Sequence, residues 1–177
     1  LFARKGVCSS ILLGQPPEPG AAPLNAPRQF AVGVRAGADM LVHTIRLLME
    51  AHPHLCLIKV DSKNAFNSAR RDLMLEQLKI KLPELYPFIY AIYGKQHGEG
   101  DRGPRLLFVL KNGEVKVVWS EEGVQQGDPA GPLLFALALQ PALIRLQEVL
   151  GQDVFILAYS DDIYILIPHG QVGEGLL

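Results

Sequence analysis

The stretch LAYSDDIYIL, residues Leu157 to Leu166, places two adjacent aspartates, Asp161 and Asp162, between two of the most apolar runs of the chain. Neighbouring carboxylates repel each other, and removing them from water is costly unless a positive charge lies beside them. Ser-Asp-Asp is ordinary turn chemistry, so a hairpin turn with both carboxylates in solvent is one interpretation. A metal site is the other. The remainder of the sequence is needed to choose between them.

The composition is that of a globular domain. The chain has 177 residues, of which 49% are hydrophobic and 20% charged, enough to bury a core. Its formal net charge of -1 provides no overall basic field, so a nucleic-acid partner would have to be held by local basic patches or by a metal. Two cysteines, Cys8 and Cys56, do not make a disulfide framework, and a reducing interior is expected.

The chain is expected to be intracellular and not to span a membrane. Its strongest apolar run, LLFALAL, is followed at once by Gln140 and Pro141, and no uninterrupted apolar segment is long enough to cross a bilayer. The first residues, LFARKGVCSSILLG, make a poor signal peptide. Because the sequence begins at Leu1 rather than Met, we expect it to be a piece of a longer protein.

The periodicity predicts two segments. Residues 1–27 concentrate Pro and Gly and are interpreted as an irregular segment with no core of its own, followed by one incomplete domain over 28–177. In that domain we expect a helix that ends before Pro53, a short buried strand over 55–60, and a helix capped by Asn67 or Ser68. The core residues expected on that second helix are Leu73, Leu75, Leu78 and Leu82.

The second half of the domain is predicted as two hairpins around a helix. Asn112-Gly113 is a strong turn signal inside RLLFVLKNGEVKVVWS, so residues 105–120 should form a hairpin. A helix is expected from Pro129 to about Leu150, and two short strands should flank the Asp pair. This order predicts an α+β fold in which helices pack on one face of a sheet. If the strand ending before Asp61 neighbours the last hairpin, three carboxylates meet at one end of the sheet.

Three carboxylates at strand ends are what two-metal phosphoryl transfer requires. Two divalent ions about 3.5–4 Å apart stabilise the attacking and leaving oxygens. Hard oxygen ligands favour Mg²⁺ or Mn²⁺. On spacing alone, however, a solvated turn is the better interpretation, because a single Asp at a strand end plus an Asp-Asp turn is a common coincidence.

Three ordered motifs change this balance. VDSKNAFN, GVQQGDPAGPLLF and AYSDDIYIL resemble, in order and spacing, the palm motifs of reverse transcriptases. The preceding RQFAVGVRAGAD is most similar to the corresponding segment of the non-LTR (LINE-like) retrotransposon group, and the resemblance covers roughly residues 28 to 168. It implies a polymerase palm whose antiparallel sheet carries the catalytic aspartates, with a partial fingers segment and no thumb.

The resemblance also implies site residues. Asp61 and Asp161 match the two metal-binding aspartates, with the backbone carbonyl of Ser62 as a further ligand. Asp162 matches the acidic neighbour near the primer end, which is included among the catalytic and metal-binding residues although it need not be a constant ligand. Tyr159 matches the aromatic residue that begins the hairpin motif. Two Mg²⁺ or Mn²⁺ ions are the implied cofactors.

Three further residues are implied to contact nucleotide or template. Phe66 matches an aromatic that lies under the incoming sugar and excludes a 2′-hydroxyl, which favours deoxynucleotides; taken alone, Phe66 is a core aromatic. Gln126 and Gly127 match a loop that packs against the template base and the nucleotide. Asp128 and Pro129 then begin the helix, with the acidic residue at its positive end.

Other groups of residues give weaker evidence for a functional site. His52, His54 and Cys56 alternate, but no second Cys/His pair accompanies them, so zinc is disfavoured. Lys63 could contact phosphate or lie in solvent. A scattered set of basic residues could form a nucleic-acid track or a solvated face: Arg35, Arg46, Arg70, Arg71 and Lys79. The basic fingers segment that grips the triphosphate has no match in residues 1–27, where Arg4 and Lys5 form an isolated pair.

Two functions follow from the resemblance. The first is the palm of an RNA-directed DNA polymerase of a retrotransposon, acting on an RNA template, a DNA primer and dNTPs in the nucleus. It would work beside the fingers, the thumb and a possible endonuclease of the parent polyprotein. The alternative is a truncated or domesticated remnant that folds, binds nucleic acid and does not synthesise DNA.

Overall fold

The computed structural model describes residues 29–95 and 102–172. The elements run α2 (Gly37–Ala51), β1 (Leu55–Val60), α3 (Arg71–Lys81), α4 (Tyr86–Tyr93), β2 (Arg105–Val109) and β3 (Val115–Trp119). They continue with α5 (Gly131–Leu150), β4 (Phe155–Tyr159), β5 (Asp162–Pro168) and a short 3₁₀ turn (His169–Gln171). Helices and antiparallel strands share one chain, which confirms the predicted α+β class.

A three-stranded antiparallel sheet in the order β1-β5-β4 is the centre of the fold. β5 pairs with β1 from Leu55↔Pro168 to Val60↔Ile163, and with β4 from Phe155↔Leu166 to Tyr159↔Asp162. Side chains alternate between the two faces of a strand. β5 is apolar at both sets of positions, so both faces of the sheet need to be covered.

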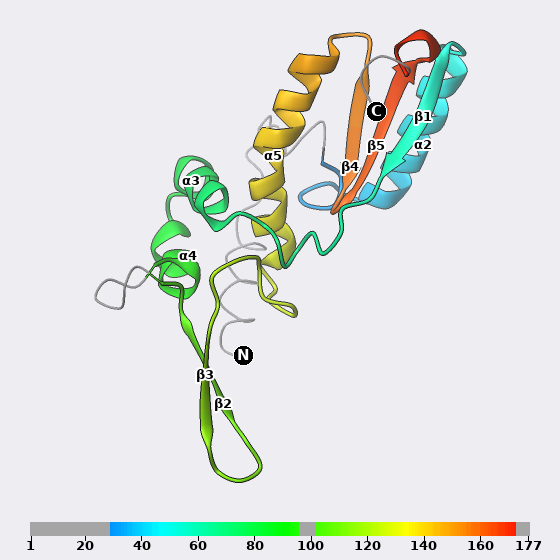
Figure 1. Cartoon of the computed structure of the whole chain (residues 1–177). Coiled ribbons are helices and arrows are strands. Elements are labelled where there is room, and N and C mark those ends of the chain that lie inside the picture. The colour runs from blue at the N-terminus through cyan, green and yellow to red at the C-terminus, as the bar shows by residue number, and fades with distance from the viewer. Residues whose placement is uncertain (1–28, 96–101, 173–177) are drawn as a thin grey trace.

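Two helices cover the two faces. On one face the isoleucines of β5 pack with Leu143, Leu146 and Leu150 of α5, and on the other Leu166 and Tyr164 pack with Leu41, Ile45 and Leu48 of α2. Figure 1 shows α5 and α2 on opposite sides of the sheet. The expectation that helices pack on one face is therefore wrong. α2 lies on the second face because Leu157 and Leu166 would otherwise be in water.

β1 is the edge strand of this sheet. Of its six residues Leu55 is buried, whereas Leu57, Lys59 and Val60 are exposed. The bounds of the predicted strand are confirmed, but the expectation of a buried strand is wrong, because β1 has a neighbour on one side alone within the described residues. The edge position leaves Lys59 free to reach across to β5.

A second core joins α3 and α4 to the first half of α5. Met74, Leu78, Ile89 and Leu134 are among its fully buried residues. The predicted core residue Leu73 is half-buried, and Met74 takes its place. Arg70, in extended backbone and without a side-chain capping bond, precedes α3, so neither Asn67 nor Ser68 caps it. α4 is an additional element that the periodicity did not predict.

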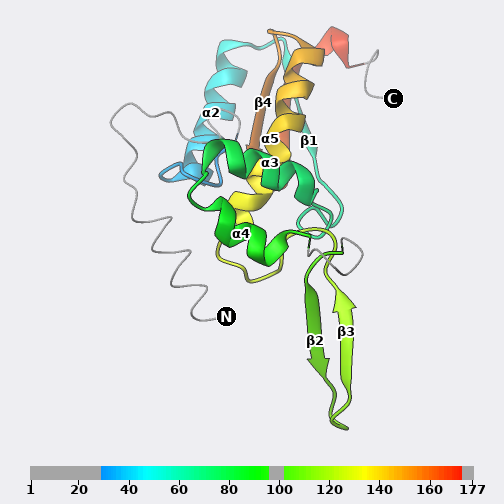
Figure 2. The ribbon, with the colours of Figure 1, turned by 90° about the vertical axis from the view of Figure 1, so that its left-hand side faces the viewer.

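The hairpin β2–β3 projects away from the rest of the molecule, as Figures 1 and 2 both show. Its turn is where Asn112-Gly113 predicts it: Gly113 has a φ of 83°, and the Asn112 side chain accepts a hydrogen bond from the Glu114 N–H at 3.0 Å. Both faces of the ribbon expose large apolar side chains, in a set of seven: Leu107, Phe108, Val109, Leu110, Val115, Val117 and Val118.

α5 is the longest described helix. It continues through Gln140 and Pro141, and Pro132 lies in its first turn as expected. Among the described residues α5 is one helix long and apolar enough to cross a membrane. Leu133, Leu134 and Leu137 are nevertheless buried inside the protein, as in the central helix of a globular domain.

Candidate active site

The β1–β5 pairing brings two of the predicted carboxylates together. Val60 is the last residue of β1 and lies opposite Ile163, so Asp61, which follows it, lies beside Asp162 at the start of β5. Asp61 is exposed and Asp162 is half-buried. Figure 1 shows that the end of β1, the β4–β5 turn and the beginning of α5 all lie toward the same end of the three-stranded sheet.

Lys59 neutralises one of these carboxylates. Its Nζ lies 2.8 Å from Asp162 Oδ1 and 5.8 Å from the centre of the Tyr164 ring. The hydrogen bond to Asp162 raises the pKa of Lys59 above its ordinary value, with Asp61 contributing in the same direction. The side chains of Lys59 and Asp162 are 53% and 38% exposed, so solvent screening keeps this pair weak. Sequence reasoning did not identify Lys59.

The third carboxylate lies in the turn between β4 and β5. Asp161 is half-buried, and Ser160 before it has a positive φ of 58°. Tyr159, at the end of β4, pairs with Asp162 and keeps 37% of its surface exposed. The two-residue loop is thus a tight hairpin, as predicted, with the aspartates at its tip.

The residues at this end of the sheet have the chemistry of a hard-cation site. Within residues 29–95 and 102–172, no group of three or more His, Cys, Asp or Glu side chains is arranged to hold a metal ion by itself. Mg²⁺ commonly takes one or two carboxylates, with water and substrate phosphates as its other ligands. Asp61, Asp161 and the carbonyl of Ser62 are oxygen donors of this kind, and their assignment as ligands stays a prediction.

Two backbone hydrogen bonds connect the segment after Asp61 to the loop before α5. The Val124 N–H donates to the Phe66 carbonyl at 2.8 Å, and the Gly123 N–H donates to the Ala69 carbonyl at 3.0 Å. The Phe66 ring stacks on Phe135 of α5 with centroids 4.5 Å apart. Phe66 is partly buried, so the ring has a core contact and an accessible remainder.

The loop between these bonds and α5 carries the other predicted contact residues. Gln126 and Gly127 are exposed, and Gly127 has a φ of 79°. A Cβ built on Gly127 would meet no atom within 4 Å, so the glycine is required by its backbone conformation rather than by crowding inside the protein. The backbone here is open to an approaching molecule.

The Arg71 side chain holds this loop in place by hydrogen bonds to its backbone. Its guanidinium donates to the carbonyls of Gly123 (2.8 Å) and Glu122 (2.9 Å), to the Ser120 carbonyl, and to the Ser120 hydroxyl (2.6 Å). It also lies 5.0 Å from the centre of the Tyr93 ring. Burial lowers the pKa of Arg71, although a guanidinium remains charged at neutral pH. Because its donors are bound to backbone, Arg71 is not available for a nucleic-acid track.

Tyr93 and Asp128 also hold the loop before α5 in place. The buried Tyr93 hydroxyl donates to Asp128 and accepts from the Gln125 N–H at 3.1 Å. Asp128 also accepts from the Ala130 N–H at 3.1 Å. α5 begins at Gly131, so the expectation that Asp128 and Pro129 begin the helix is wrong: Asp128 forms a turn ahead of it.

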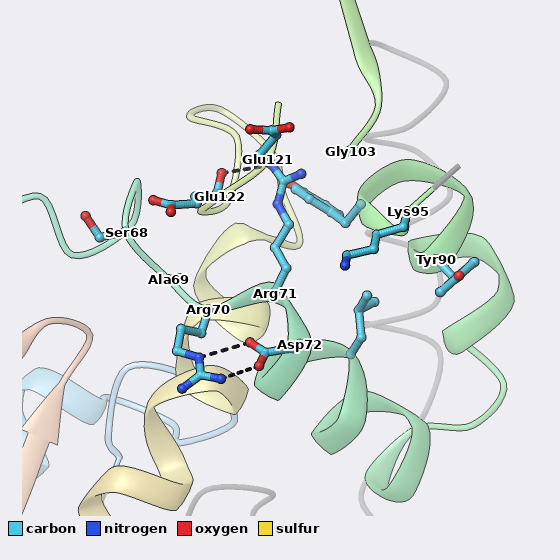
Figure 3. A pocket seen from close by; sticks show the side chains of 12 residues that line it. Ser68, Ala69, Arg70, Arg71, Asp72, Tyr90, Lys95, Gly103, Glu121 and Glu122 are labelled. Atoms are coloured by element: carbon cyan, nitrogen blue, oxygen red, sulfur yellow. Dashed lines mark hydrogen bonds and ion pairs between the residues drawn. The ribbon is translucent and has the colours of Figure 1, made fainter. Parts of the chain in front are cut away.

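A cavity of about 680 Å³ lies between α3, α4 and the loop after β3. Figure 3 shows Arg70 paired with Asp72 and Arg71 directed at the loop, with Lys95 opposite Glu121 and Glu122 across the opening. The lining carries charges of both signs, and its two arginines already have partners. This cavity has no surplus charge that would select an ionic ligand.

Among the residues that the structure describes, His52, His54 and Cys56 are not grouped so as to hold a metal ion together. The centre of the His52 ring lies 5.8 Å from that of His54 and 5.6 Å from that of Phe155. The Cys56 thiol donates a hydrogen bond to the Ile167 carbonyl at 3.3 Å. Lys63 is exposed in the segment after Asp61.

The sequence does contain signals for some of the residues that hold the loop before α5. Arg71, Met74 and Leu78 are spaced three and four residues apart, which puts all three on one face of α3. YPFIYAIYG, with a proline in its first turn and Gly94 as its C-cap, has the pattern of a short helix that carries Tyr93. No local pattern indicates which distant carbonyls Arg71 binds.

Comparison with known proteins identifies the family. Residues 22–176 match the family described as reverse transcriptase (RNA-dependent DNA polymerase). The chain belongs to the reverse transcriptase family. It is 30% identical over 158 residues to the Pol polyprotein of the type-1 retrotransposable element R2 of Nasonia vitripennis, and 30% identical over 115 residues to the SLACS 132 kDa retrotransposable element protein of Trypanosoma brucei gambiense. The predicted relationship to non-LTR retrotransposon proteins is confirmed.

Solved reverse transcriptase structures share the fold. Telomerase of Candida tropicalis matches 94% of this chain with a TM-score of 0.53, and telomerase of Candida albicans matches 76% with a TM-score of 0.50, each at 10% identity. The match to R2 spans 84% of this chain and 14% of the R2 polyprotein, and the match to SLACS spans 63% of this chain and 9% of the SLACS protein. This chain covers 26% of the Candida albicans telomerase chain and 34% of the Candida tropicalis one. It therefore corresponds to a small part of its relatives, and the palm-like architecture is confirmed.

We predict that Tyr93→Phe lowers the free energy of unfolding by about 1–3 kcal/mol, because it removes the hydrogen bonds that the Tyr93 hydroxyl makes with the buried Asp128 carboxylate and with the Gln125 N–H. Urea unfolding of this segment gives the value. Tyr90→Phe on the same helix is the matched control, since the Tyr90 hydroxyl has no hydrogen bond within the described residues. Its effect should stay within about 0.5 kcal/mol. Equal losses in the two variants would contradict the role given to the Tyr93 hydroxyl.

Proposed function

We propose that this segment is the catalytic palm of a retrotransposon RNA-directed DNA polymerase, which adds dNTPs to a primer 3′-hydroxyl on an RNA template. The β1–β5 register is the observation that supports the proposal: Val60 pairs with Ile163, so Asp61 follows β1 at the level where β5 begins with Asp162, directly after the turn that contains Asp161. Because the chain belongs to the reverse transcriptase family, DNA synthesis is the reaction in which these carboxylates would act.

The chemistry divides among the residues at this end of the sheet. Two divalent ions, when bound, stabilise charge on the attacking hydroxyl and on the leaving pyrophosphate. Asp61, Asp161 and the Ser62 carbonyl supply the oxygen donors. The primer 3′-oxygen loses its proton and bonds to the α-phosphorus of the dNTP, while the bond from that phosphorus to the bridging oxygen breaks and pyrophosphate leaves.

Asp162 has a different part in this proposal. Its Oδ1 lies 2.8 Å from Lys59 Nζ, and we expect it to shape the field near the primer end and to be a less constant metal ligand than Asp61 and Asp161. Tyr159 lies beside it in the last pair of the hairpin. Phe66 forms the floor beneath the sugar, and Gln126 and Gly127 contact the template base and the nucleotide.

The partners follow from the same proposal. An RNA template, a DNA primer and dNTPs are the substrates, and the remaining parts of a polyprotein such as those of R2 and SLACS would supply fingers, thumb and any endonuclease. A nuclear site of action fits a reaction on chromosomal DNA. The alternative, a non-catalytic remnant that binds nucleic acid, is distinguished by the second experiment below.

We predict that Mg²⁺ or Mn²⁺ raises the melting temperature of the 177-residue chain. At ten times its Kd an ion adds about 1.4 kcal/mol of stability, or roughly 3–5 °C for a chain of this size. Asp61→Asn with Asp161→Asn should abolish the shift, whereas Asp162→Asn should retain most of it, because Lys59 already balances Asp162. Asp153→Asn, an exposed carboxylate in the α5–β4 connection, is the control. A full shift in the double variant would refute the metal assignment.

We predict that dNTP incorporation on an RNA template depends on Asp161. The isolated chain should extend a primer poorly, because positioning supplies much of phosphoryl-transfer catalysis. In this segment extended by the fingers and thumb of a parent element, Asp161→Ala should reduce incorporation by more than about 100-fold, since even groups that only orient a metal ligand are worth 10–100-fold. An extended wild-type protein that folds and binds template without incorporating dNTPs would favour the remnant.

We predict that Phe66 controls sugar choice in that extended enzyme. A clash of about 3 kcal/mol with a 2′-hydroxyl corresponds to discrimination of roughly 100-fold, which Phe66→Val should lose. The measurement is the ratio of kcat/KM for dTTP to that for UTP on poly(A). Phe135→Leu is the control, because it disturbs the same stacked pair without removing the Phe66 ring. If Phe66→Val leaves the ratio unchanged in a folded protein, Phe66 is a core residue only.

A further inference from the structure

Gln29 is a fully buried amide that binds the turn carrying Asp161. Its relative exposure is 1%. Its Nε2 donates to the Ser160 carbonyl at 3.1 Å, and its Oε1 accepts from the Ser160 N–H at 2.8 Å and from the Ala31 N–H at 3.0 Å. One side chain, 131 positions away in the sequence, therefore satisfies both the N–H and the C=O of a single turn residue.

The backbone around Gln29 is docked along the same strand. Gln29 forms a parallel bridge with Ala158, and the Phe30 N–H donates to the Ala158 carbonyl at 2.7 Å. Phe30 packs in the cluster that covers the α2 face of the sheet. The segment thus lies alongside the end of β4, and the Gln29 side chain extends from it to the turn.

Ser160 is where such a restraint has an effect. It is a non-glycine residue with a φ of 58°, a left-handed conformation that is unfavourable for L-residues. Buried amide hydrogen bonds to both of its peptide groups offset that cost and select one orientation of the turn. Asp161 is the next residue, so the direction of its carboxylate depends on the Ser160 peptide.

The side-chain chemistry of Gln29 suits this task. A primary amide is both donor and acceptor, whereas an ionised carboxylate accepts alone and an ammonium donates alone. A charged side chain would also add to the field at a site that already holds three carboxylates. A neutral amide can fix the turn without changing that field.

We propose that Gln29 is a positioning residue for the catalytic turn: its amide holds the Ser160 peptide in the left-handed conformation and so sets the direction of the Asp161 carboxylate. The effect on metal binding rests on the proposed function, while the clamp on Ser160 stands on its own contacts. The proposal gives a role to the RQFAVGV segment, which the metal site itself does not use.

The test compares the buried Gln29 with the half-buried Gln147, whose side chains bind backbone at opposite ends of β4. Gln29→Met keeps the length of the side chain and removes its hydrogen bonds. Gln147→Met is the matched control, because the Gln147 amide also bonds backbone, donating to the carbonyls of Gly151 (2.7 Å) and Val154 (2.6 Å) where β4 begins. The measurements are the melting temperature and the Kd of the 177-residue chain for Mn²⁺, taken as the part of binding that Asp161→Asn removes.

Both methionine variants should lower the melting temperature, but Gln29→Met alone should raise the Mn²⁺ Kd by about tenfold or more. Gln147→Met should change that Kd by less than twofold. Adding Ser160→Gly to Gln29→Met should recover melting temperature, since glycine accepts a positive φ, without recovering Mn²⁺ affinity. An unchanged Kd in Gln29→Met, or equal losses of affinity in both methionine variants, would overturn the proposal.

Amide hydrogen exchange separates this proposal from the metal assignment. In the wild-type chain the Ser160 N–H should exchange far more slowly than the exposed loop amides at Gln126 and Gly127, and Gln29→Met should remove that protection. If Asp161→Asn leaves Mn²⁺ binding intact, the metal assignment falls, and the Ser160 protection still decides the clamp. A Ser160 amide that exchanges as fast as an open loop refutes the clamp, whether or not the methionine variant folds.

Discussion

The register between β1 and β5 is the constraint on which the rest of the structure depends. Side chains alternate along a strand, so a slip of one residue would turn every β5 side chain to the opposite face. Ile163, Ile165 and Ile167 would lose α5, and Asp162 would turn away from Lys59. The packing on both faces therefore fixes the pairing, and the pairing places Asp61 beside the Asp161–Asp162 turn. Burial of apolar surface over the whole sheet thus determines a geometry among a few charged groups at its end.

Local patterns predicted most of the elements but not their surroundings. Leu55–Val60 was found because Pro53 and Asp61 bound a short β-rich run, and the Asn112-Gly113 turn was found because few residues adopt its backbone conformation. The same patterns did not show that β1 is an edge strand or that α2 covers the second face. Those facts depend on which strands are neighbours, and strand order is not written in any one segment.

The candidate site divides in the same way. Its carboxylates belong to contiguous motifs, so their type and order could be predicted, together with the family to which they belong. The groups that hold them act across the chain. Arg71 binds carbonyls some 50 residues away, Tyr93 joins α4 to the loop before α5, and Gln29 reaches a turn 131 positions later. None of these residue types is unusual, and the role of each depends on a partner that is distant in the sequence. A single sequence therefore could not reveal these roles.

The β2–β3 hairpin gives the segment an uneven stability. A two-stranded ribbon is marginally stable in water, and this one has apolar side chains on both faces and lies apart from the two cores. Its strands can therefore open while the sheet and helices remain intact, at a local free-energy cost far below that of global unfolding. An open run such as LLFVL is rich in β-forming residues and carries no charge, and it has the character of a segment that pairs with another copy of itself. The exposed apolar side chains of the projecting ribbon therefore favour self-association of this segment, independently of how stable the three-stranded sheet is.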